Sequence, residues 1–495
     1  MSYEIGADYD QHYLLPPRIE DWVPQDHPAR FIREYIDALD LKNLGFNERK
    51  ARDGRPNYRA DLLLKVWTYG YFMRIYSTRK LEQACREHMG MIWLTGNNAP
   101  DHNTLWRFFR DHRKALRKIF KEGLVVAAKA ELVGMVLHAV DGTKIKAKVA
   151  TRNGWDRKDL KKLLKRMDGS IDEMMHEVER LEGEEIGEYR LPEGLDDPEK
   201  LKATIKELLQ EMDEIDRDHL HPNDKEARMM KGDGWTRFAY NAQAVVDKES
   251  GLIVAEDVVN DEGDAHQLTR MIDQVAETLG ESAEETVADG GYYSGEELAK
   301  AENKGYNVIV SMRKSTGNYH SSHFEYDPQR NICMCPEGKE LPYQRTKLGR
   351  GKRYRVQVYQ CKNHRECPYR WQCSRDKNGR QIEISEYHGA ILRQRDKQKH
   401  LDNLEKLRKR KTIVEPVFGQ IKECMGFTRF TVNGLEWVKT QWSLLCTVVN
   451  LKKMYKWWRE GRLVIRDLSL APILTNTANL LHGFRYACVP TYSNV

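Results

Sequence analysis

The sequence predicts an α/β protein. A mixed sheet with helices follows an N-terminal all-helical domain and is interrupted by a helical-hairpin insertion and a cysteine-rich insertion. Helical periodicity fills residues 1–132, and short apolar strands alternate with helices through residues 133–150 and 233–312. The two insertions differ from the rest in charge and in cysteine content. At 495 residues the chain is long for one core, so about three structural units are expected.

Residues 1–132 are predicted to form a helical DNA-binding domain. Its expected helices are Pro28–Leu41, Ala60–Arg74, Ser77–His88 and Asp101–Leu132. Basic and aromatic side chains interleave here, and the aromatic ones are assigned to the helical core. The basic ones, Arg55, Arg59 and Arg107 among them, are left to contact DNA. Arg55 lies in a Gly-Arg-Pro turn before a helix, a position suited to a phosphate.

The segments 133–150 and 233–312 are predicted to build the sheet of a catalytic core. The expected strands are Gly134–Val140, Lys144–Val149, Arg237–Val246, Gly251–Val259, Thr286–Ala288 and Tyr306–Ser311, with helices at Asp264–Leu279 and Ser294–Lys304. The third and fourth strands flank a four-residue turn and are expected to pair as a hairpin. Asp264 is interpreted as a helix cap, and the alternative is that it supports other acidic residues of this core in holding a metal ion. Ser294 and Glu297 are expected to form a capping box.

Residues 151–232 are predicted to form an acidic helical hairpin. Apolar residues step by three and four along both halves: Leu160, Leu163, Met167, Ile171, Met174, Val178 and Leu181, then Leu201, Ile205, Leu208, Met212 and Ile215. Residues 156–216 hold 11 Lys and Arg against 20 Asp and Glu, a net charge of −9. This charge argues against DNA contact and leaves packing within the chain or self-association as the two interpretations.

Residues 313–390 are predicted to form a basic, cysteine-rich insertion resembling a zinc ribbon. Its cysteines are Cys333, Cys335, Cys361, Cys367 and Cys373, and His364 lies among them. The spacing is C-x-C, then C-x5-C-x5-C, and thiolates from two such knuckles can close a tetrahedral Zn²⁺ site. Free thiols are the alternative. Residues 391–459 are predicted as the C-terminal helices of the catalytic core, and residues 460–495 as a tail.

The charge distribution indicates a polyanionic partner. The net charge is only +6, yet residues 343–422 hold 22 Lys and Arg against 8 Asp and Glu, a net +14. Nucleic acid is the first candidate for such a segment. No apolar run approaches the ~18 residues of a membrane span, and no signal peptide is visible, so a cytoplasmic protein without a membrane partner is expected.

Three acidic residues stand in settings that suit metal-assisted phosphoryl transfer. Asp141 and Asp289 each follow an apolar run that predicts a buried strand, so both are expected at strand ends. Glu415 lies in a basic helical segment. Carboxylates on rigid elements can hold two divalent cations about 4 Å apart, which clamp the attacking and leaving oxygens. Any one of these residues alone is better explained as a turn or cap residue.

In these stretches the chain resembles the DDE transposases of bacterial insertion sequences. The matching segments are Ala139–Thr143, Tyr240–Asp247, Val287–Tyr292 and Val414–Lys422, and the resemblance covers roughly residues 10–458. It implies a ribonuclease-H-like catalytic domain and a location with the bacterial nucleoid in the cytoplasm. It also implies a homodimer on double-stranded DNA, comprising the transposon ends and the target.

The resemblance assigns roles to individual residues. Asp141, Asp289 and Glu415 correspond to the catalytic ligands of two Mg²⁺ or Mn²⁺ ions, and Lys422 to a basic residue that contacts the DNA end. Arg408 and Lys411 stand where many relatives have Tyr and Arg, so the charge is kept at Lys411 and the aromatic ring is lost. The implied chemistry is hydrolysis at the terminal inverted repeats, then strand transfer by the freed 3′ hydroxyl.

Two alternatives from the sequence stay open beside a transposase. One is a nuclease of the same fold that cuts without strand transfer. The other is a domesticated DNA-binding protein that has lost catalysis.

Proline directly after Glu415 predicts a new helix start or a kink at the third carboxylate.

Overall fold

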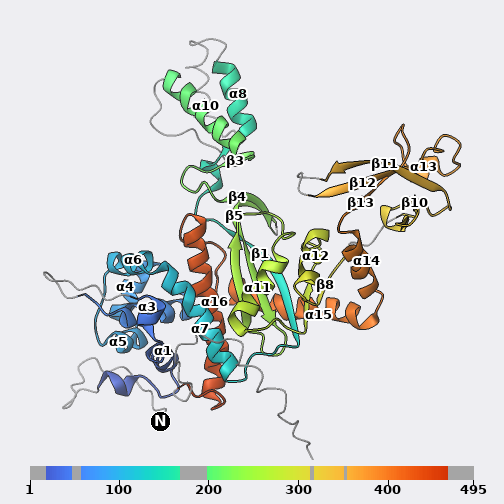
Figure 1. The fold of residues 1–495 in the computed structure, drawn as a ribbon. Helices are drawn as coiled ribbons and strands as arrows, with labels where there is room; N and C mark the ends of the chain where they lie inside the picture. The colour runs from blue at the N-terminus through green and yellow to red at the C-terminus, as the bar shows by residue number, and fades with distance from the viewer. Residues whose placement is uncertain are drawn as a thin grey trace, which may run out of the picture.

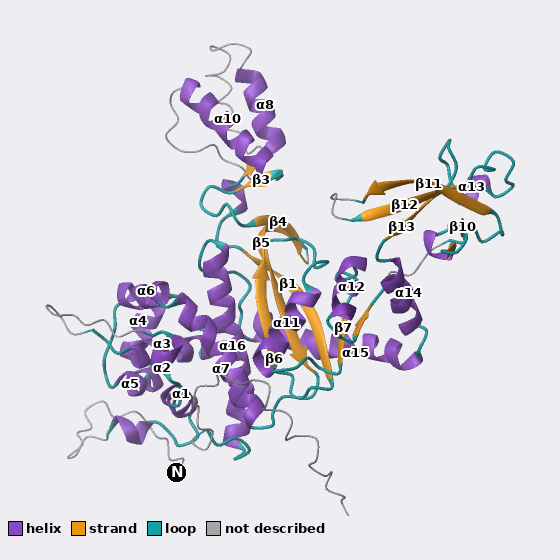
Figure 2. Ribbon diagram, viewed as in Figure 1, coloured by secondary structure: helices purple, strands orange, loops and turns teal. Residues whose placement is uncertain are grey.

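The computed structural model describes residues 18–46, 57–167, 198–232, 234–312, 317–349 and 354–465. A central sheet has the N-terminal helices on one side, a helical hairpin beyond one end and a second, cysteine-rich sheet on the other side (Figure 1). Figure 2 shows strands concentrated in these two sheets and helices elsewhere. None of the helices in the described ranges combines the length and apolar character that a membrane crossing needs.

The N-terminal part is helical. Its helices are the 3-10 helix Ile19–Trp22, α1 (Pro28–Asp37), α2 (Leu41–Leu44), α3 (Ala60–Phe72), α4 (Thr78–Glu87), α5 (Met89–Thr95), α6 (His102–Asp111) and α7 (Arg113–Lys129). One helix was expected over Asp101–Leu132, but the chain leaves helical geometry at His112, with φ −112° and ψ 22°, and divides it into α6 and α7. Trp67, Tyr69 and Tyr71 are buried, which confirms the assignment of these aromatics to the core.

The central sheet has six strands: β1 (Leu137–Lys146), β4 (Arg228–Gly232), β5 (Trp235–Asp247), β6 (Ile253–Val259), β7 (Glu285–Ala288) and β8 (Val308–Val310). Its order is β4-β5-β1-β7-β8, and β6 also pairs with β5. The hairpin of β5 and β6 is antiparallel, as expected, and β5 is antiparallel to β1. In contrast β1, β7 and β8 run parallel, so the sheet is mixed.

The prediction of two separate strands around Asp141 is wrong. Strand β1 runs without a break through Asp141, Gly142 and Thr143, which face Ala244, Gln243 and Ala242 of β5. The long β5 supplies backbone partners across the whole segment, so the glycine does not end the strand. Asp141 therefore lies within a strand, whereas Asp289 directly follows one, as expected.

Helices cover the sheet and join it to the N-terminal part. They are α11 (Leu268–Leu279), α12 (Gly295–Asn303), α14 (His388–Lys397), α15 (Leu401–Gly419), a π-helical turn (Gln420–Cys424) and α16 (Leu435–Arg459). Helix α15 packs on β1, β5, β7 and β8, while α16 packs on α7, α3 and β6. Helix α16 therefore ties the N-terminal helices to the sheet (Figure 1).

Helix α15 continues through Pro416, so the prediction of a new helix start at this residue is wrong. Burial of Val414, Val417 and Phe418 explains why the helix persists. A π-helical turn directly follows α15 and contains Lys422.

The two insertions stand apart from the central sheet. The first holds β2 (Trp155–Asp156), α8 (Arg157–Met167), α10 (Pro198–Glu214) and β3 (His219–Leu220). Leu160 and Leu163 pack against Ile205 and Leu208, which confirms the predicted hairpin seam as far as it is described. The predicted seam residues Ile171, Met174, Val178 and Leu181 lie outside the described residues.

The second insertion is an antiparallel five-stranded sheet. Its strands are β9 (Glu325–Asp327), β10 (Ile332–Met334), β11 (Glu340–Leu348), β12 (Arg355–Gln360) and β13 (Gln381–Ser385), with a short helix α13 (Arg370–Cys373) between the last two. The strand order is β13-β12-β11-β10-β9. A small core of Phe324, Leu341, Tyr359 and Ile382 holds this sheet together.

Candidate active site

Asp141, within β1, and Asp289, directly after the parallel strand β7, are neighbours. The last paired residues of β1 and β7 are Val140 and Ala288, so the residues that follow them stand side by side. Each carboxylate accepts a nearby backbone N–H: Oδ1 of Asp141 from Gly142 at 2.9 Å, and Oδ1 of Asp289 from Gly291 at 2.8 Å. Burial raises the pKa of Asp141, and the charge of Asp289 adds to that rise.

Arg410 of α15 balances the buried charge of Asp141. Its Nη1 lies 2.6 Å from Oδ2 of Asp141, and the two side chains are 10% and 21% exposed. The guanidinium opposes the effect of burial and lowers the pKa of Asp141. Arg410 was not predicted as a site residue, because in the sequence it lies in a run of basic residues. The available signal was helical periodicity, since Arg410 shares a face with the buried Ile413, Val414 and Val417.

Glu415 lies on the opposite, exposed side of α15. It shares this face with the exposed Arg408 and Lys411, since the three positions are spaced by seven and four residues. Among the described residues, Glu415 does not gather with Asp141 and Asp289 into a group that could hold a metal ion. Lys422 is partly buried and has interactions of its own.

The three carboxylates do not make a metal site in this arrangement. Among the described residues, no group of three or more His, Cys, Asp or Glu side chains gathers closely enough to hold an ion. Asp141 and Asp289 supply hard oxygen donors side by side, which suits Mg²⁺. However, Arg410 is paired with Asp141 and the third donor lies outside the group. The geometry therefore provides two adjacent donors and not the full ligand set.

Asp264 lies on the other face of β1 beside these residues. Its Oδ1 accepts from Asn241 at 2.6 Å and from Gln243 at 2.7 Å, and Lys144 Nζ is 3.8 Å away. The interpretation of Asp264 as a helix cap is wrong, because α11 begins only at Leu268 with Gln267 as its N-cap. The carboxylate of Asp264 accepts hydrogen bonds from the buried side-chain amides of Asn241 and Gln243 and does not cap α11.

The prediction of a capping box at α12 is also wrong. Ser294 occupies the N-cap position but its side chain makes no capping bond. Glu297 is 2% exposed and instead accepts from the backbone N–H of Thr269 at 3.1 Å. It therefore ties α12 to the start of α11.

The basic residues predicted for DNA contact are partly accessible. The Arg59 side chain is 81% exposed before α3 and pairs with Asp61 at 2.9 Å. Arg107 is exposed on α6 and donates to Thr104 at 3.2 Å, whereas Arg55 lies outside the described residues. Lys65, a further basic residue of these helices, is buried and pairs with Asp37 and Asp61 at 2.5 and 3.2 Å, so it is not available to DNA.

The cysteines of the second insertion are not equivalent. Cys333 is fully buried in the small core, while Cys335, Cys361 and Cys373 lie partly buried beside it. Burial raises the pKa of the Cys361 and Cys373 thiols, and the neighbouring thiols, including Cys367, add to that rise. In the described part of the chain these thiols do not form a group that could hold a metal ion. His364 Nε2 pairs with the Lys377 carbonyl oxygen at 2.8 Å.

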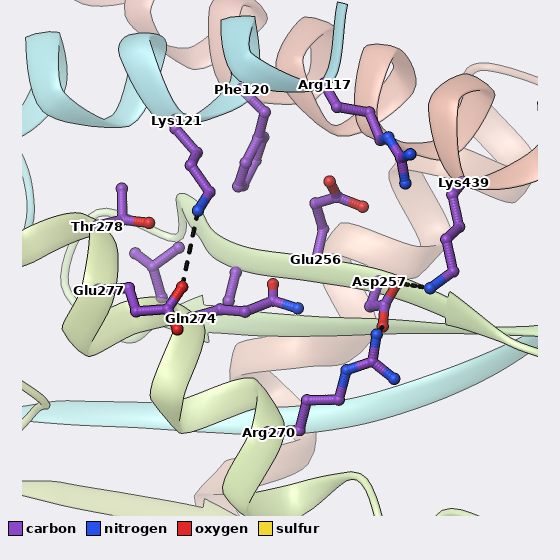
Figure 3. Close-up of a pocket in the computed structure, with 12 residues that line it drawn as sticks. Arg117, Phe120, Lys121, Glu256, Asp257, Arg270, Gln274, Glu277, Thr278 and Lys439 are labelled. Atoms are coloured by element: carbon purple, nitrogen blue, oxygen red, sulfur yellow. Dashed lines mark ion pairs between the residues drawn. The ribbon is translucent and has the colours of Figure 1, made fainter. Parts of the chain in front are cut away.

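A polar cavity lies away from these residues, between α7, β6, α11 and α16 (Figure 3). It encloses about 270 Å³. Asp257 is held between Arg270 at 2.5 Å and Lys439 at 3.0 Å, and Glu256 points toward α7 and α16. Burial, and then the charge of Asp257, raise the pKa of Glu256 to about 8. The cavity is a site of charge balance and contains none of the predicted catalytic residues.

Comparison with known proteins places transposase families at both ends of the chain. Residues 334–455, which include Glu415, match a family described as a transposase DDE domain. Residues 17–111 match a transposase domain of the DUF772 family. The resemblance to DDE transposases of insertion sequences is thereby confirmed. The segment that carries Asp141 and Asp289 lies between the two matched regions.

No curated protein sequence matches the chain. Among solved structures, a piggyBac transposase synaptic complex with hairpin DNA is similar at 8% identity and a TM-score of 0.32, over 94% of this chain and 87% of that one. A similarity of this size carries no argument about the fold or the site.

Proposed function

We propose that this chain is a transposase that cuts DNA at the terminal inverted repeats of an insertion sequence and joins the freed ends to target DNA. Asp141, Asp289 and Glu415 are its proposed catalytic residues. The observation that carries the proposal is the adjacency of Asp141 and Asp289, which directly follow the paired residues Val140 and Ala288 of β1 and β7. Both lie at strands that pack against α15, the helix that bears Glu415 within the matched DDE domain.

The catalytic core is proposed to be ribonuclease-H-like. The support is a mixed sheet in which β1 pairs with the antiparallel β5 of the β5–β6 hairpin on one side and has the parallel β7 and β8 on the other. Helix α15 crosses β1, β5, β7 and β8. Such a sheet rigidly positions residues that lie far apart in sequence.

DNA is the proposed partner, held by two basic surfaces. The exposed Arg408 and Lys411 on α15, followed by Lys422, face the DNA end next to Glu415. Arg59 and Arg107 of the N-terminal helices face the inverted repeat. A homodimer in the DNA complex is part of the proposal, because two ends must be brought together before they are joined.

A divalent cation, Mg²⁺ or Mn²⁺, is proposed as the cofactor. The proposal of a cation rests on the match to the DDE domain and on the oxygen donors of Asp141 and Asp289. The described carboxylates do not by themselves form a complete ligand set. When bound, such an ion lowers the pKa of a water and stabilises developing charge on phosphate oxygens. Arg410 opposes the rise that burial causes in the pKa of Asp141, and its ion pair orients the carboxylate of Asp141.

A structural Zn²⁺ in the cysteine-rich sheet remains a prediction of the sequence. We propose Cys335, Cys361, Cys367 and Cys373 as its ligands, since Cys333 is buried in the core. Metal analysis of the purified protein tests it. Bound zinc that is lost in Cys367→Ser and kept in Cys333→Ser supports the assignment, and protein free of zinc contradicts it.

A cleavage and strand-transfer assay tests the proposed function. The substrate is DNA carrying the inverted repeats that flank the gene, with Mg²⁺, and the variants are Asp141→Asn and Asp289→Asn. We expect joined products from the wild type, none from either variant and unchanged binding of the DNA end. Asp261→Asn, an exposed acidic control paired with Arg228, should remain active. Cleavage without joining would indicate the nuclease, and binding without cleavage the inactive DNA-binding protein.

A further inference from the structure

A chain of buried polar side chains links Asp264 to the loop that carries Asp289. Asn241 and Gln243 of β5 are fully buried, and both donate to Oδ1 of Asp264. Gln243 in turn accepts a hydrogen bond from the hydroxyl of the buried Tyr292. The backbone N–H of Tyr292 donates to the carbonyl oxygen of Asp289 at 3.3 Å.

The same chain fills the space beside both catalytic strands. A Cβ on Gly142, the residue after Asp141, would lie 2.4 Å from Nε2 of Gln243 and 2.9 Å from Oδ1 of Asp264. A Cβ on Gly291 would lie 3.0 Å from Oδ1 of Asp289 and 3.2 Å from Oδ2 of Asp264. The carboxylate of Asp264 therefore lies close to the residue after Asp141 and to the loop of Asp289. A side chain at Gly142 would displace Gln243 or Asp264, and one at Gly291 would be tightly packed.

We propose that Asp264 is a positioning residue of this site, which fixes the Asp289 loop through Gln243 and Tyr292. The proposal deepens the proposed function and rests on it. An ionised acceptor makes stronger hydrogen bonds than a neutral one, so the carboxylate orients both amides. Each oriented amide then presents its oxygen in one direction, and that of Gln243 faces Tyr292. Without Asp264, two buried N–H groups lose an acceptor.

Hydrogen exchange of residues 286–293, measured without DNA or metal, tests the positioning role directly. We expect exchange of the amides in this segment to speed up about tenfold or more in Asp264→Ala and in Tyr292→Phe. Asp261→Asn is the matched control, because it removes a charge from the same loop but keeps the backbone oxygen that Asn241 contacts. Unchanged exchange in Asp264→Ala would overturn the proposal.

Cleavage measurements supply the second readout. Asp264→Ala should lower the cleavage rate about ten- to a hundredfold with unchanged binding of the DNA end. The cleavage rate of the Asp264→Ala/Tyr292→Phe double variant should be no lower than that of the more impaired single variant. Additive losses would overturn the shared chain. If Asp264→Ala does not fold, Asp264→Asn keeps one acceptor oxygen and should show a smaller change of the same kind. Altered exchange with an inactive wild type would refute the proposed function but support the role of Asp264.

Discussion

At the scale of single residues, the site is a balance of buried charge. Asp141 carries its carboxylate beneath α15, where burial disfavours ionisation and Arg410 favours it. A buried ion pair contributes less to stability than the loss of either partner costs, because the remaining charge has no counterion. Removal of Arg410 should therefore change the pKa of Asp141, and through it the stability of the protein.

Arg410→Gln is expected to lower the free energy of unfolding by about 1–3 kcal/mol at pH 8 and by less at pH 5. Without the guanidinium the pKa of Asp141 rises further above its unfolded value. Stability is then retained at low pH, where Asp141 is protonated, and lost as pH rises through the folded pKa. Urea unfolding at the two pH values measures this. Arg408→Gln, two residues away and exposed, is the control, and equal losses in both variants would contradict the argument.

Glu256 gives a second pH-dependent expectation. Its pKa is raised from 4.5 to about 8, so the wild type should lose stability as pH rises through this window, by at most about 1.4 kcal/mol per pH unit. Glu256→Gln stays neutral and should be the more stable protein at pH 8.5 but not at pH 5. Melting temperatures at both pH values test this. Glu277→Gln changes a 67% exposed carboxylate of the same cavity and should leave the profile unchanged.

At the scale of elements, helix α15 has a buried face that packs on the sheet and an exposed face that carries Glu415. Its buried face presents Arg410 and Val414 to the sheet, and its exposed face presents Lys411 and Glu415. The helix keeps this division even though Pro416 removes a backbone donor from its interior. Packing of the apolar face against four strands offsets that loss.

Pro416→Ala is expected to stabilise the protein by about 1–3 kcal/mol, because alanine restores the missing N–H at an exposed helical position. Urea denaturation measures the change, with Lys411→Ala as a helical control that should alter stability by less than about 0.5 kcal/mol. A destabilised Pro416→Ala protein would show that the proline fits a local geometry that alanine does not.

At the scale of the whole molecule, α16 joins the N-terminal helices to the central sheet. Trp442 donates to the carbonyl oxygen of Gln243 at 3.2 Å, and Gln441 donates to the Tyr71 hydroxyl at 2.8 Å. One helix thus contacts both the strand behind the site and the N-terminal core. The DNA surfaces proposed on the two parts are held in a fixed relation by these contacts.

Lys411→Glu is expected to weaken binding of DNA ends and to reduce the salt dependence of binding, by about one unit in the slope of log K against log salt for the lost lysine. Fluorescence anisotropy over a range of NaCl concentrations measures both. Lys409→Glu is the matched control, since Lys409 already pairs with Glu405 at 2.5 Å. Equal effects of the two reversals would argue against a specific DNA face on α15.

The sequence by itself determined the order of elements and most of their kinds. The periodic apolar residues predicted α16 at Leu435–Arg459 and the β5–β6 hairpin, and the motif order predicted a DDE transposase. These features depend on residues close together in the chain, where periodicity and turn chemistry act directly.

Only the tertiary structure decided how the candidate site is assembled. The continuation of β1 through Asp141 depends on backbone partners in β5, and the adjacency of Asp141 and Asp289 depends on the parallel register of β1 and β7. The inward turn of Arg410 and the capture of Asp264 by buried amides depend on which faces are covered. Such pairings join segments far apart in sequence, so no local pattern in the chain specifies them.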